Sequence, residues 1–582
     1  LSKGLLLIGL LLLVGVIVTV QYLSLLTPNP QSPTPTPQPA LPLPDKPSIV
    51  VLPFTNMSGD PAQDYFSDGL TDVLTGHLAK IFSLFVISRN SAFTYKGKAV
   101  KVQDVSKELG VRYVLEGSVH RADQRVRITA QLIDATTGYH LWSEQYDRPL
   151  QDLFALQDEI VQKIVTTLKP QLTLREQGYS VPKLTDNLDA YDAFLRGCEY
   201  SSRSTKETNA QARQMLEKAI ALDPQYADAY VVLGYTYLWE WGYRWSADPQ
   251  TLERAFELAQ KAAVLDDSLS GAHSLLGWVY VFKQQYDQSI AEGERAIALA
   301  PNDADSYAAQ AGVLNYAGRP EEALRAVKQA MRLNPRFTSQ YLVDLGFTYR
   351  MTGRSAEAIA TLKEAGSRNP NNLQAHLQLA FSYLEQWGSQ QGAATQTLEL
   401  AEAAGQQALA LNDSFYANHI NLGLIYLSQR QYEQALAEME RSVSLAPTLS
   451  ENYAALAVVL SCMGRTEAAL EAATQALRLK PELADGHLAW VGIAYAVAGH
   501  YEEARASLQR FLSRYPNMLG VHLMLAAVYS ELGQAVEART EAAEVLRLNP
   551  NFSLEIHKQR VTIKDPAVLE RHIAALRKAG LK

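Results

Sequence analysis

The sequence predicts a mainly helical protein: a solenoid of about ten helical hairpins, preceded by a small mixed α/β domain and one transmembrane helix. Three observations predict this class. A helix-ending marker recurs ten times in the later part of the chain, short apolar strands alternate with amphipathic stretches before it, and residues 5–26 carry no charge. With 582 residues, the chain is long enough for several such units.

Shifts in composition divide the chain into six predicted segments. They are a transmembrane anchor at 1–27, a proline-rich linker at 28–47, an α/β domain at 48–175, a second linker at 176–189, the solenoid at 190–555 and a C-terminal capping helix at 556–582.

The anchor is predicted from the 22 nearly all apolar residues at 5–26, which as a helix would span about 33 Å. A cleaved signal peptide is the alternative, but its apolar region would be shorter and would end at a small-residue cleavage site. Lys3 precedes the span and no positive charge follows until Lys46. This asymmetry favours an orientation in which most of the chain lies outside the cytoplasm. The reverse orientation, with a cytoplasmic array, is a weaker alternative.

Nine prolines lie within residues 28–47, so this stretch is predicted to form an extended polyproline II spacer of up to roughly 60 Å. The chain begins with Leu1 rather than Met, from which we expect either a processed start or a missing upstream segment.

The α/β domain is predicted from short apolar runs and amphipathic stretches. Predicted strands are 49–54, 84–87, 113–119, 126–133 and 139–146, and predicted helices are 69–81, 102–109 and 153–172. Val126 and Ile128 alternate with Arg125 and Arg127, as in an antiparallel strand with one buried face. Gly110 is expected to end the second helix.

Four motifs follow one another through this domain: SIVVLPFTNMSGDPAQDYFSDGLTDVLTGHLAKI, VISRNSAFTYKG, ELGVRYVLEGSV and RITAQLIDATTGYHLWSEQYDR. In this order they resemble the TolB N-terminal-like domain. The resemblance implies a non-enzymatic interaction or sensing module of bacterial signalling proteins, in which a membrane span precedes the domain and helical repeats follow it. It therefore implies a single-pass protein of the bacterial inner membrane.

Four carboxylates spaced by four residues, Asp60, Asp64, Asp68 and Asp72, are a candidate cation site. Pro61 interrupts a helix through them, and the residue order of a calcium loop is absent. We therefore expect carboxylates that interact with a helix N-terminus and no metal site.

The repeats are identified by helix-ending markers at residues 224, 267, 301, 335, 370, 413, 447, 481, 516 and 550. Most are 34 or 35 residues apart, with a small residue at the eighth position, an aromatic at the eleventh and alanine at the twentieth, as in Gly346, Tyr349 and Ala358. This pattern resembles the tetratricopeptide repeat, in which small residues let paired helices approach closely.

A larger period of 146 residues is superimposed on the repeats and indicates an internal duplication. It places Trp241 on Trp387 and His273 on His419, and each copy has a nine-residue insertion after its tryptophan. The aromatic stretch YLWEWGYRW at 237–245 is expected to pack the first insertion rather than to contact a partner.

The resemblance to the tetratricopeptide repeat implies a concave groove lined by the first helix of each hairpin. The candidate partner-binding residues are Tyr235, Trp239, Trp278, Phe282, Asn315, Tyr316, Phe347, Arg350, Met351, Phe381 and Leu424, with Leu238, Val281, Leu384, Ile420 and Leu427 beside them. These side chains are mostly apolar, which points to a protein or peptide partner. Only Asn315 and Arg350 fit the family's carboxylate clamp. Burial of these side chains between repeats is the alternative.

Catalysis and cofactor binding are not expected. The chain lacks phosphate-loop, dinucleotide, H-E-x-x-H and G-x-S-x-G motifs, and its net charge of −8 argues against nucleic acid. Cys198 and Cys462 form neither a disulfide pattern nor a zinc motif. Packing is the expected role of four histidines on first helices: His273, His419, His487 and His522.

The sequence thus predicts a non-catalytic, membrane-anchored interaction scaffold or sensor that binds a protein or peptide through its helical array. The alternative is the extracytoplasmic regulatory half of a signalling protein whose adenylate cyclase, kinase or DNA-binding domain lies upstream. The partner's identity and the oligomeric state stay open.

Overall fold

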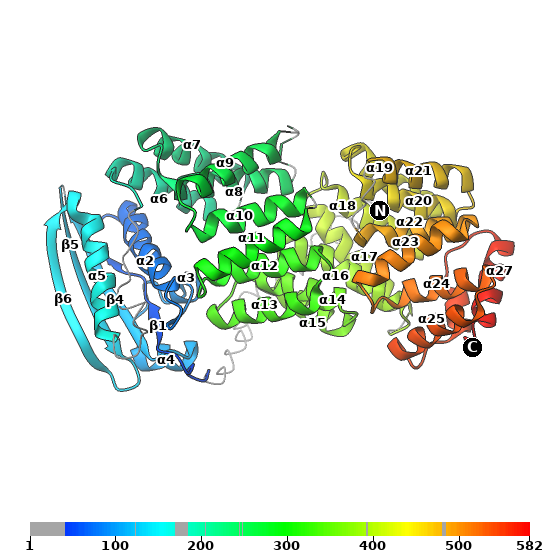
Figure 1. Ribbon diagram of the computed structural model, residues 1–582, viewed down its shortest axis with the longest axis horizontal. Coiled ribbons are helices and arrows are strands. Elements are labelled where there is room, and N and C mark those ends of the chain that lie inside the picture. Colours follow the sequence, from blue (N-terminus) through cyan, green and yellow to red (C-terminus); the bar gives the residue numbers. More distant parts are fainter. Residues whose placement is uncertain are drawn as a thin grey trace, which may run out of the picture.

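The computed structural model describes residues 41–582 apart from 123, 169–183, 204, 244, 247, 249, 284, 392–393 and 480–484. The α/β domain forms one end of the molecule, and the helical array extends from it (Figure 1). The predicted anchor, most of the proline-rich linker and much of the second linker lie outside the described residues.

The α/β domain is built on a sheet with the order β3-β1-β4-β5-β6, in which β2 also pairs with β4. The strands are β1 (Ser48–Val51), β2 (Thr55–Asn56), β3 (Phe85–Val86), β4 (Tyr113–Ala122), β5 (Arg125–Asp134) and β6 (Tyr139–Pro149). The helices are α2 (Asp64–Ala79), α3 (Arg89–Phe93), α4 (Val102–Leu109) and α5 (Leu153–Leu168). Strands β1 to β4 pair in parallel, and β4, β5 and β6 pair antiparallel.

Both faces of β1 are buried, because successive side chains of a strand point to opposite faces. Ile49 and Val51 lie in one core with α2 and α5, whereas Val50 and Leu52 lie in a second core with α4. Each core also includes residues of the helical array. The array therefore completes the core of this domain.

Several element boundaries differ from the prediction. Helix α2 begins at Asp64 rather than residue 69, because Asp60 caps a 3-10 turn (Pro61–Gln63) that leads directly into it. The predicted strand 126–133 is confirmed within the longer β5. The helix predicted at 102–109 is confirmed as α4, and Gly110 ends it with φ +62°. Helix α3 was not predicted.

Ten antiparallel helical hairpins follow, which confirms the predicted solenoid. Their helices are α6 (Leu188–Ser202), α7 (Lys206–Leu222), α8 (Ala227–Gly242), α9 (Thr251–Leu265), α10 (Ser270–Phe282), α11 (Tyr286–Leu299), α12 (Ala304–Tyr316), α13 (Pro320–Leu333), α14 (Ser339–Met351), α15 (Ser355–Arg368), α16 (Leu373–Gly388), α17 (Ala394–Leu411), α18 (Tyr416–Ser428), α19 (Tyr432–Leu445), α20 (Ser450–Cys462), α21 (Thr466–Leu479), α22 (Asp485–Ala498), α23 (Tyr501–Arg514), α24 (Leu519–Glu531) and α25 (Ala535–Leu548). The chain ends with α26 (Leu554–Arg560) and α27 (Pro566–Lys578).

Small residues at the eighth repeat position have the predicted role. A Cβ atom at Gly346 would lie 2.5 Å from the Leu362 side chain of the paired helix, which is too close without movement. The two insertions also lie where they were predicted, because α8 and α16 have 16 residues whereas α10 and α18 have 13. The connections that follow α8 and α16 are correspondingly long.

The α/β domain contacts the array at several places. At α6, Asp192 accepts hydrogen bonds from Tyr65 and, at 3.3 Å, from Arg121. Before α12, the buried Asn302 side chain donates to the carbonyl of Ile81 at 2.8 Å. These contacts join the domain to the first and fourth hairpins, so it bridges the first half of the solenoid.

The C-terminal hairpins fold back onto loops in the middle of the array. Arg514 Nη1 donates to the carbonyl of Ala317 at 2.6 Å, Asn549 Nδ2 to that of Ser389 at 2.8 Å, and Arg430 Nη2 to that of Gln559 at 2.9 Å. Helices α24 and α25 consequently lie near α14 and α17 in Figure 1. The solenoid thereby closes around its own axis.

The predicted transmembrane helix requires a correction. Among the described residues no helix is both long and apolar enough to cross a bilayer, and the longest, α17, carries Glu399 and Glu402. The predicted span at 5–26 lies outside the described residues. The structure therefore does not support the transmembrane element of the fold class or the single-pass inner-membrane location.

Candidate functional site: an aromatic groove

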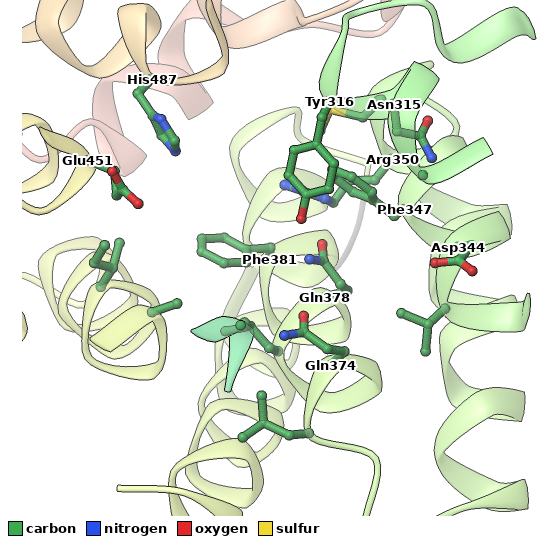
Figure 2. A pocket seen from close by; sticks show the side chains of 18 of the residues that line it. Asn315, Tyr316, Asp344, Phe347, Arg350, Gln374, Gln378, Phe381, Glu451 and His487 are labelled. Atoms are coloured by element: carbon green, nitrogen blue, oxygen red, sulfur yellow. The ribbon is translucent and has the colours of Figure 1, made fainter. Parts of the chain in front are cut away.

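Closure of the solenoid leaves a central groove of about 2210 Å³ along its axis. Its wall is formed by the first helices of successive hairpins, from α8 to α24, and by the α26–α27 segment. The first helices line it because their outer sides pack against the second helices, so their remaining faces point to the axis. Figure 2 shows the middle of this groove.

A row of aromatic rings lines the N-terminal half of the groove. The rings of Trp278 and Tyr316 are 6.5 Å apart, and those of Tyr316 and Phe347 are 5.6 Å apart. Tyr235 stacks on Trp239 with 6.1 Å between ring centroids. Tilted and edge contacts of this kind hold the rings in place and leave part of each surface open.

Arg350 continues this row toward Phe381. Its guanidinium lies 5.2 Å from the ring centroid of Phe347 and 5.3 Å from that of Phe381. Its Nη1 donates to Glu385 at 2.6 Å. Burial raises the pKa of Glu385, and the Arg350 guanidinium opposes that effect. The cation is thus held between two rings and one carboxylate of the wall.

Asp344 lies on the same face of α14 as Phe347, one helical turn earlier. Its carboxylate accepts a hydrogen bond from the Gln340 amide at 3.2 Å. Burial raises the pKa of Asp344 to about 7, and the Gln340 hydrogen bond only partly opposes it. In Figure 2 its carboxylate borders the same space as Gln374, Gln378 and Phe381.

All eleven candidate residues named from the sequence line the groove. Trp239, Phe282 and Tyr316 are 39%, 39% and 48% exposed, so these three are not buried between repeats. Asn315 is fully buried and donates to Thr348 Oγ1 at 2.9 Å, which gives it a packing role at the groove wall. Of the five aliphatic residues named beside them, Leu238 and Leu427 are buried and lie outside the lining.

The end of α8 and the insertion after it contribute to the groove, which the sequence did not predict. Trp241 in α8 and Tyr243 and Trp245 after it line the groove, and the Tyr243 and Trp245 rings stack 5.2 Å apart. The stretch 237–245 therefore packs on itself and also extends the aromatic wall.

Sequence reasoning also missed Asp344 and the C-terminal contribution. Asp344 precedes Phe347 by three residues, and this helical spacing could have identified it. His557 and His572 line the far end, where their Nε2 atoms are 3.1 Å apart. Burial lowers the pKa of His557 to about 3 and that of His572 to about 4.

The four aspartates of the candidate cation site have separate partners. Asp60 caps its turn, Asp64 and Asp68 lie 3.2 Å and 2.8 Å from Lys96, and Asp72 pairs with Arg89. Within the described ranges, no group of three or more histidine, cysteine, aspartate or glutamate side chains is placed to hold a metal ion.

Three of the four histidines on first helices form a recurring pair with a glutamate on the second helix. His273 bonds Glu292 at 2.6 Å, His419 bonds Glu438 at 2.6 Å, and His522 bonds Glu541 at 2.5 Å. The other ring nitrogen of each contacts a backbone carbonyl six residues earlier. These histidines tie the two helices of a hairpin together and lie outside the groove lining.

Comparison with known families identifies tetratricopeptide repeats at residues 270–303, 309–372, 416–449 and 495–558. The presence of this repeat type in the chain is therefore confirmed. A protein named putative adenylate cyclase 3, from Rhizobium meliloti (strain 1021), is 47% identical over 211 residues, which are 36% of each chain. A BBSome complex member BBS4 homologue from Drosophila melanogaster is 22% identical over 37% of this chain and 43% of its own length. The chain thus spans well under half the length of these relatives.

Solved structures were compared in the same way. A thermophilic tetratricopeptide-repeat protein of Thermus thermophilus matches 34% of this chain and 99% of its own with 24% identity and a TM-score of 0.31. Human IFIT1 bound to m7Gppp-AAAA matches 69% of this chain and 88% of its own with 16% identity and a TM-score of 0.40.

Proposed function

We propose that the protein is an interaction scaffold that holds a segment of a partner protein inside the central groove. The observation that carries this proposal is the row of aromatic rings along the N-terminal half of the central groove. Large aromatic surface that stays open in a folded protein typically marks a site of association. The repeats support the same proposal, because stacked helical hairpins commonly present extended concave binding surfaces.

The groove's own tryptophans offer a direct test. Six of the seven tryptophans line it: Trp239, Trp241, Trp245, Trp278, Trp387 and Trp490. Peptides selected on the full chain from a random 15-residue library should therefore shift its tryptophan emission. The double variant Phe347→Ala, Phe381→Ala should weaken the selected peptides by roughly 30-fold or more, as central interface aromatics do.

The matched control is Val264→Ala on α9, where the side chain is 81% exposed and outside the groove lining. It should leave binding unchanged. The proposal fails if selected peptides leave tryptophan emission unchanged, or if they bind the double variant as tightly as the wild type.

A second candidate function is the regulatory module of a signalling protein. The 47% identity to a protein named putative adenylate cyclase 3 supports it, as does the resemblance of the α/β domain to the TolB N-terminal-like domain. Because the α/β domain packs against the array, a conformational change at the groove can be transmitted to that domain through packed side chains. An immunoblot of source cells with an antibody against residues 186–553 tests this candidate. A band clearly larger than a 582-residue chain supports it, and a band of that size opposes it.

A further inference from the structure

The polarity of the groove limits what can bind in it. Residues 176–582 contain 37 basic and 46 acidic side chains, so the array is acidic. Five carboxylates line the groove: Asp303, Asp305, Asp344, Glu385 and Glu451. Four basic side chains line it as well: Arg203, Lys206, Arg350 and Arg560. Which of the carboxylates already have partners therefore decides the charge that a ligand would meet.

Four of the five carboxylates are satisfied within the chain. Asp303 caps α12 by accepting from the backbone of Ser306, and Asp305 accepts from the Tyr341 hydroxyl at 2.6 Å. Glu385 pairs with Arg350 at 2.6 Å. Glu451 accepts from the Tyr416 hydroxyl at 3.0 Å.

Asp344 has the weakest partner of the five. Like Asp303, Asp305 and Glu451, it pairs with no cation in the described part of the chain, but its side-chain hydrogen bond is a long one, 3.2 Å from the neutral amide of Gln340. Its side chain is half-buried, and burial raises its pKa to about 7. The hydroxyls of Tyr243 and Tyr316 are close enough for this carboxylate to raise the pKa of each, after the larger effect of burial. A carboxylate without a cation therefore lies among open aromatic rings.

The same wall already shows how such a carboxylate is satisfied. Arg350 brings a guanidinium to Glu385 while two phenylalanine rings flank it. The ring of Phe347, one helical turn after Asp344, already faces the Arg350 guanidinium, whereas no cation of the described part of the chain pairs with Asp344 itself. Aromatic faces and a carboxylate together favour a guanidinium or ammonium group.

We infer that the segment held in the groove carries an arginine or lysine side chain that pairs with Asp344 beside Phe347, while its apolar neighbours cover the aromatic wall. This inference rests on the proposed function and adds the chemical class of the partner. The ligand charge that this groove prefers is therefore positive. A carboxylate clamp prefers the opposite charge, because it holds an acidic chain end through basic residues.

The test uses the full chain and synthetic nine-residue peptides with blocked ends, taken from the peptides that it selects. Each peptide is paired with a version in which arginine is replaced by citrulline, which keeps the shape and removes the charge. Tryptophan emission then gives both affinities. We expect the arginine form to bind the wild type roughly 30-fold more tightly, the scale of a desolvated charge pair.

Two variants locate the effect. Asp344→Asn should reduce the preference for arginine over citrulline to under about threefold, because the amide keeps the shape and loses the charge. Glu451→Gln removes another charge of the groove, from a carboxylate that already has a partner, and should keep the preference. The citrulline comparison on the wild type needs no variant and so does not depend on how Asp344→Asn folds.

Three results would overturn the inference: equal binding of the arginine and citrulline forms, selection of acidic peptides, or equal loss of preference in both variants. In each of them peptides still bind, so the proposed function survives. If no peptide of any composition changes the tryptophan emission, both proposals fail together.

Discussion

The ion pair between Arg350 and Glu385 allows a quantitative test of the groove wall. We consider Arg350→Met, Glu385→Gln and the double variant. Methionine keeps the apolar stem that packs between Phe347 and Phe381, so the change mainly removes the charge. The two side chains are only 13% and 26% exposed, so solvent screens the pair weakly.

The expected magnitude follows from this geometry. With Nη1 and the carboxylate oxygen 2.6 Å apart, the charge centres are about 4 Å apart, which gives an attraction of about 4 kcal/mol at an effective dielectric constant near 20. Desolvation of both groups offsets much of it. Loss of one partner alone leaves the other charge buried, so each single variant should lose about 3 kcal/mol of local stability. The double variant should lose about 1 kcal/mol, because neither charge remains.

Hydrogen–deuterium exchange is the suitable assay, because a solenoid opens in parts and a single global free energy is poorly defined. Amides of α14 and α16 should exchange about 100-fold faster in each single variant and less than tenfold faster in the double variant. Amides of α20 serve as the internal reference. Exchange within twofold of the wild type in both single variants would refute the reasoning, and so would losses that simply add in the double variant.

Three further predictions concern other parts of the molecule. Burial lowers the pKa of His419, but its hydrogen bonds to Glu438 and a backbone carbonyl outweigh that effect and raise the pKa overall. The stabilisation is therefore complete below the unfolded-state pKa near 6.5 and is lost as the pH rises through the higher folded-state pKa. His419→Gln should accordingly flatten the decline of the thermal midpoint between about pH 6 and 8.5. Gly117→Ala should cost about 2–3 kcal/mol in chemical denaturation of the α/β domain, because its Cβ would lie 2.2 Å from the Thr129 carbonyl oxygen. Asn302→Ala should cost about 1–2 kcal/mol and speed exchange in the last turn of α2, because the carbonyl of Ile81 loses its shorter hydrogen bond and keeps only the 3.2 Å bond from the Leu84 amide.

Each of these predictions has a matched control. Gln406 on the neighbouring helix α17 is exposed and its amide does not titrate, so Gln406→Ala should leave the pH profile unchanged. A Cβ at Gly76 meets nothing within 4 Å, so Gly76→Ala should be neutral or stabilising by about 0.5–1 kcal/mol. Asn371 is exposed, and Asn371→Ala should not change exchange in α2. A control that behaves like its paired variant would contradict that prediction.

Local patterns predicted the helical array well. The recurring markers and the small residue at Gly346 reflect contacts between helices that are adjacent in the chain. Such contacts repeat with the sequence and can be found without coordinates. Helix α3 was missed because its five residues are too few to show a helical period. The early start of α2 was missed because it follows a three-residue 3-10 turn, which is also too short to show one.

The groove residues were predictable for the same reason. Positions on the inner face of a first helix recur with the repeat, so Trp278, Tyr316 and Phe347 could be named from the sequence. Asp344 shares that face but is not at one of the groove positions that the tetratricopeptide-repeat resemblance implies. Asp344 is a candidate binding residue because no cation of the described residues pairs with it. That fact can be established only when the side chains of all the other groove helices have been placed.

Residues close together in the chain set the repeat type, the number of hairpins, the place of the insertions and the aromatic character of the inner face, so all four could be predicted from sequence. Three features emerged only from the folded arrangement: the solenoid closes on itself, the α/β domain bridges its first half, and Asp344 lies without a cation in the described groove. Closure depends on small rotations summed over ten hairpins and on side chains such as Arg514 reaching loop carbonyls nearly 200 residues away. Every residue has a backbone carbonyl, so the sequence does not distinguish the one that a distant arginine will contact.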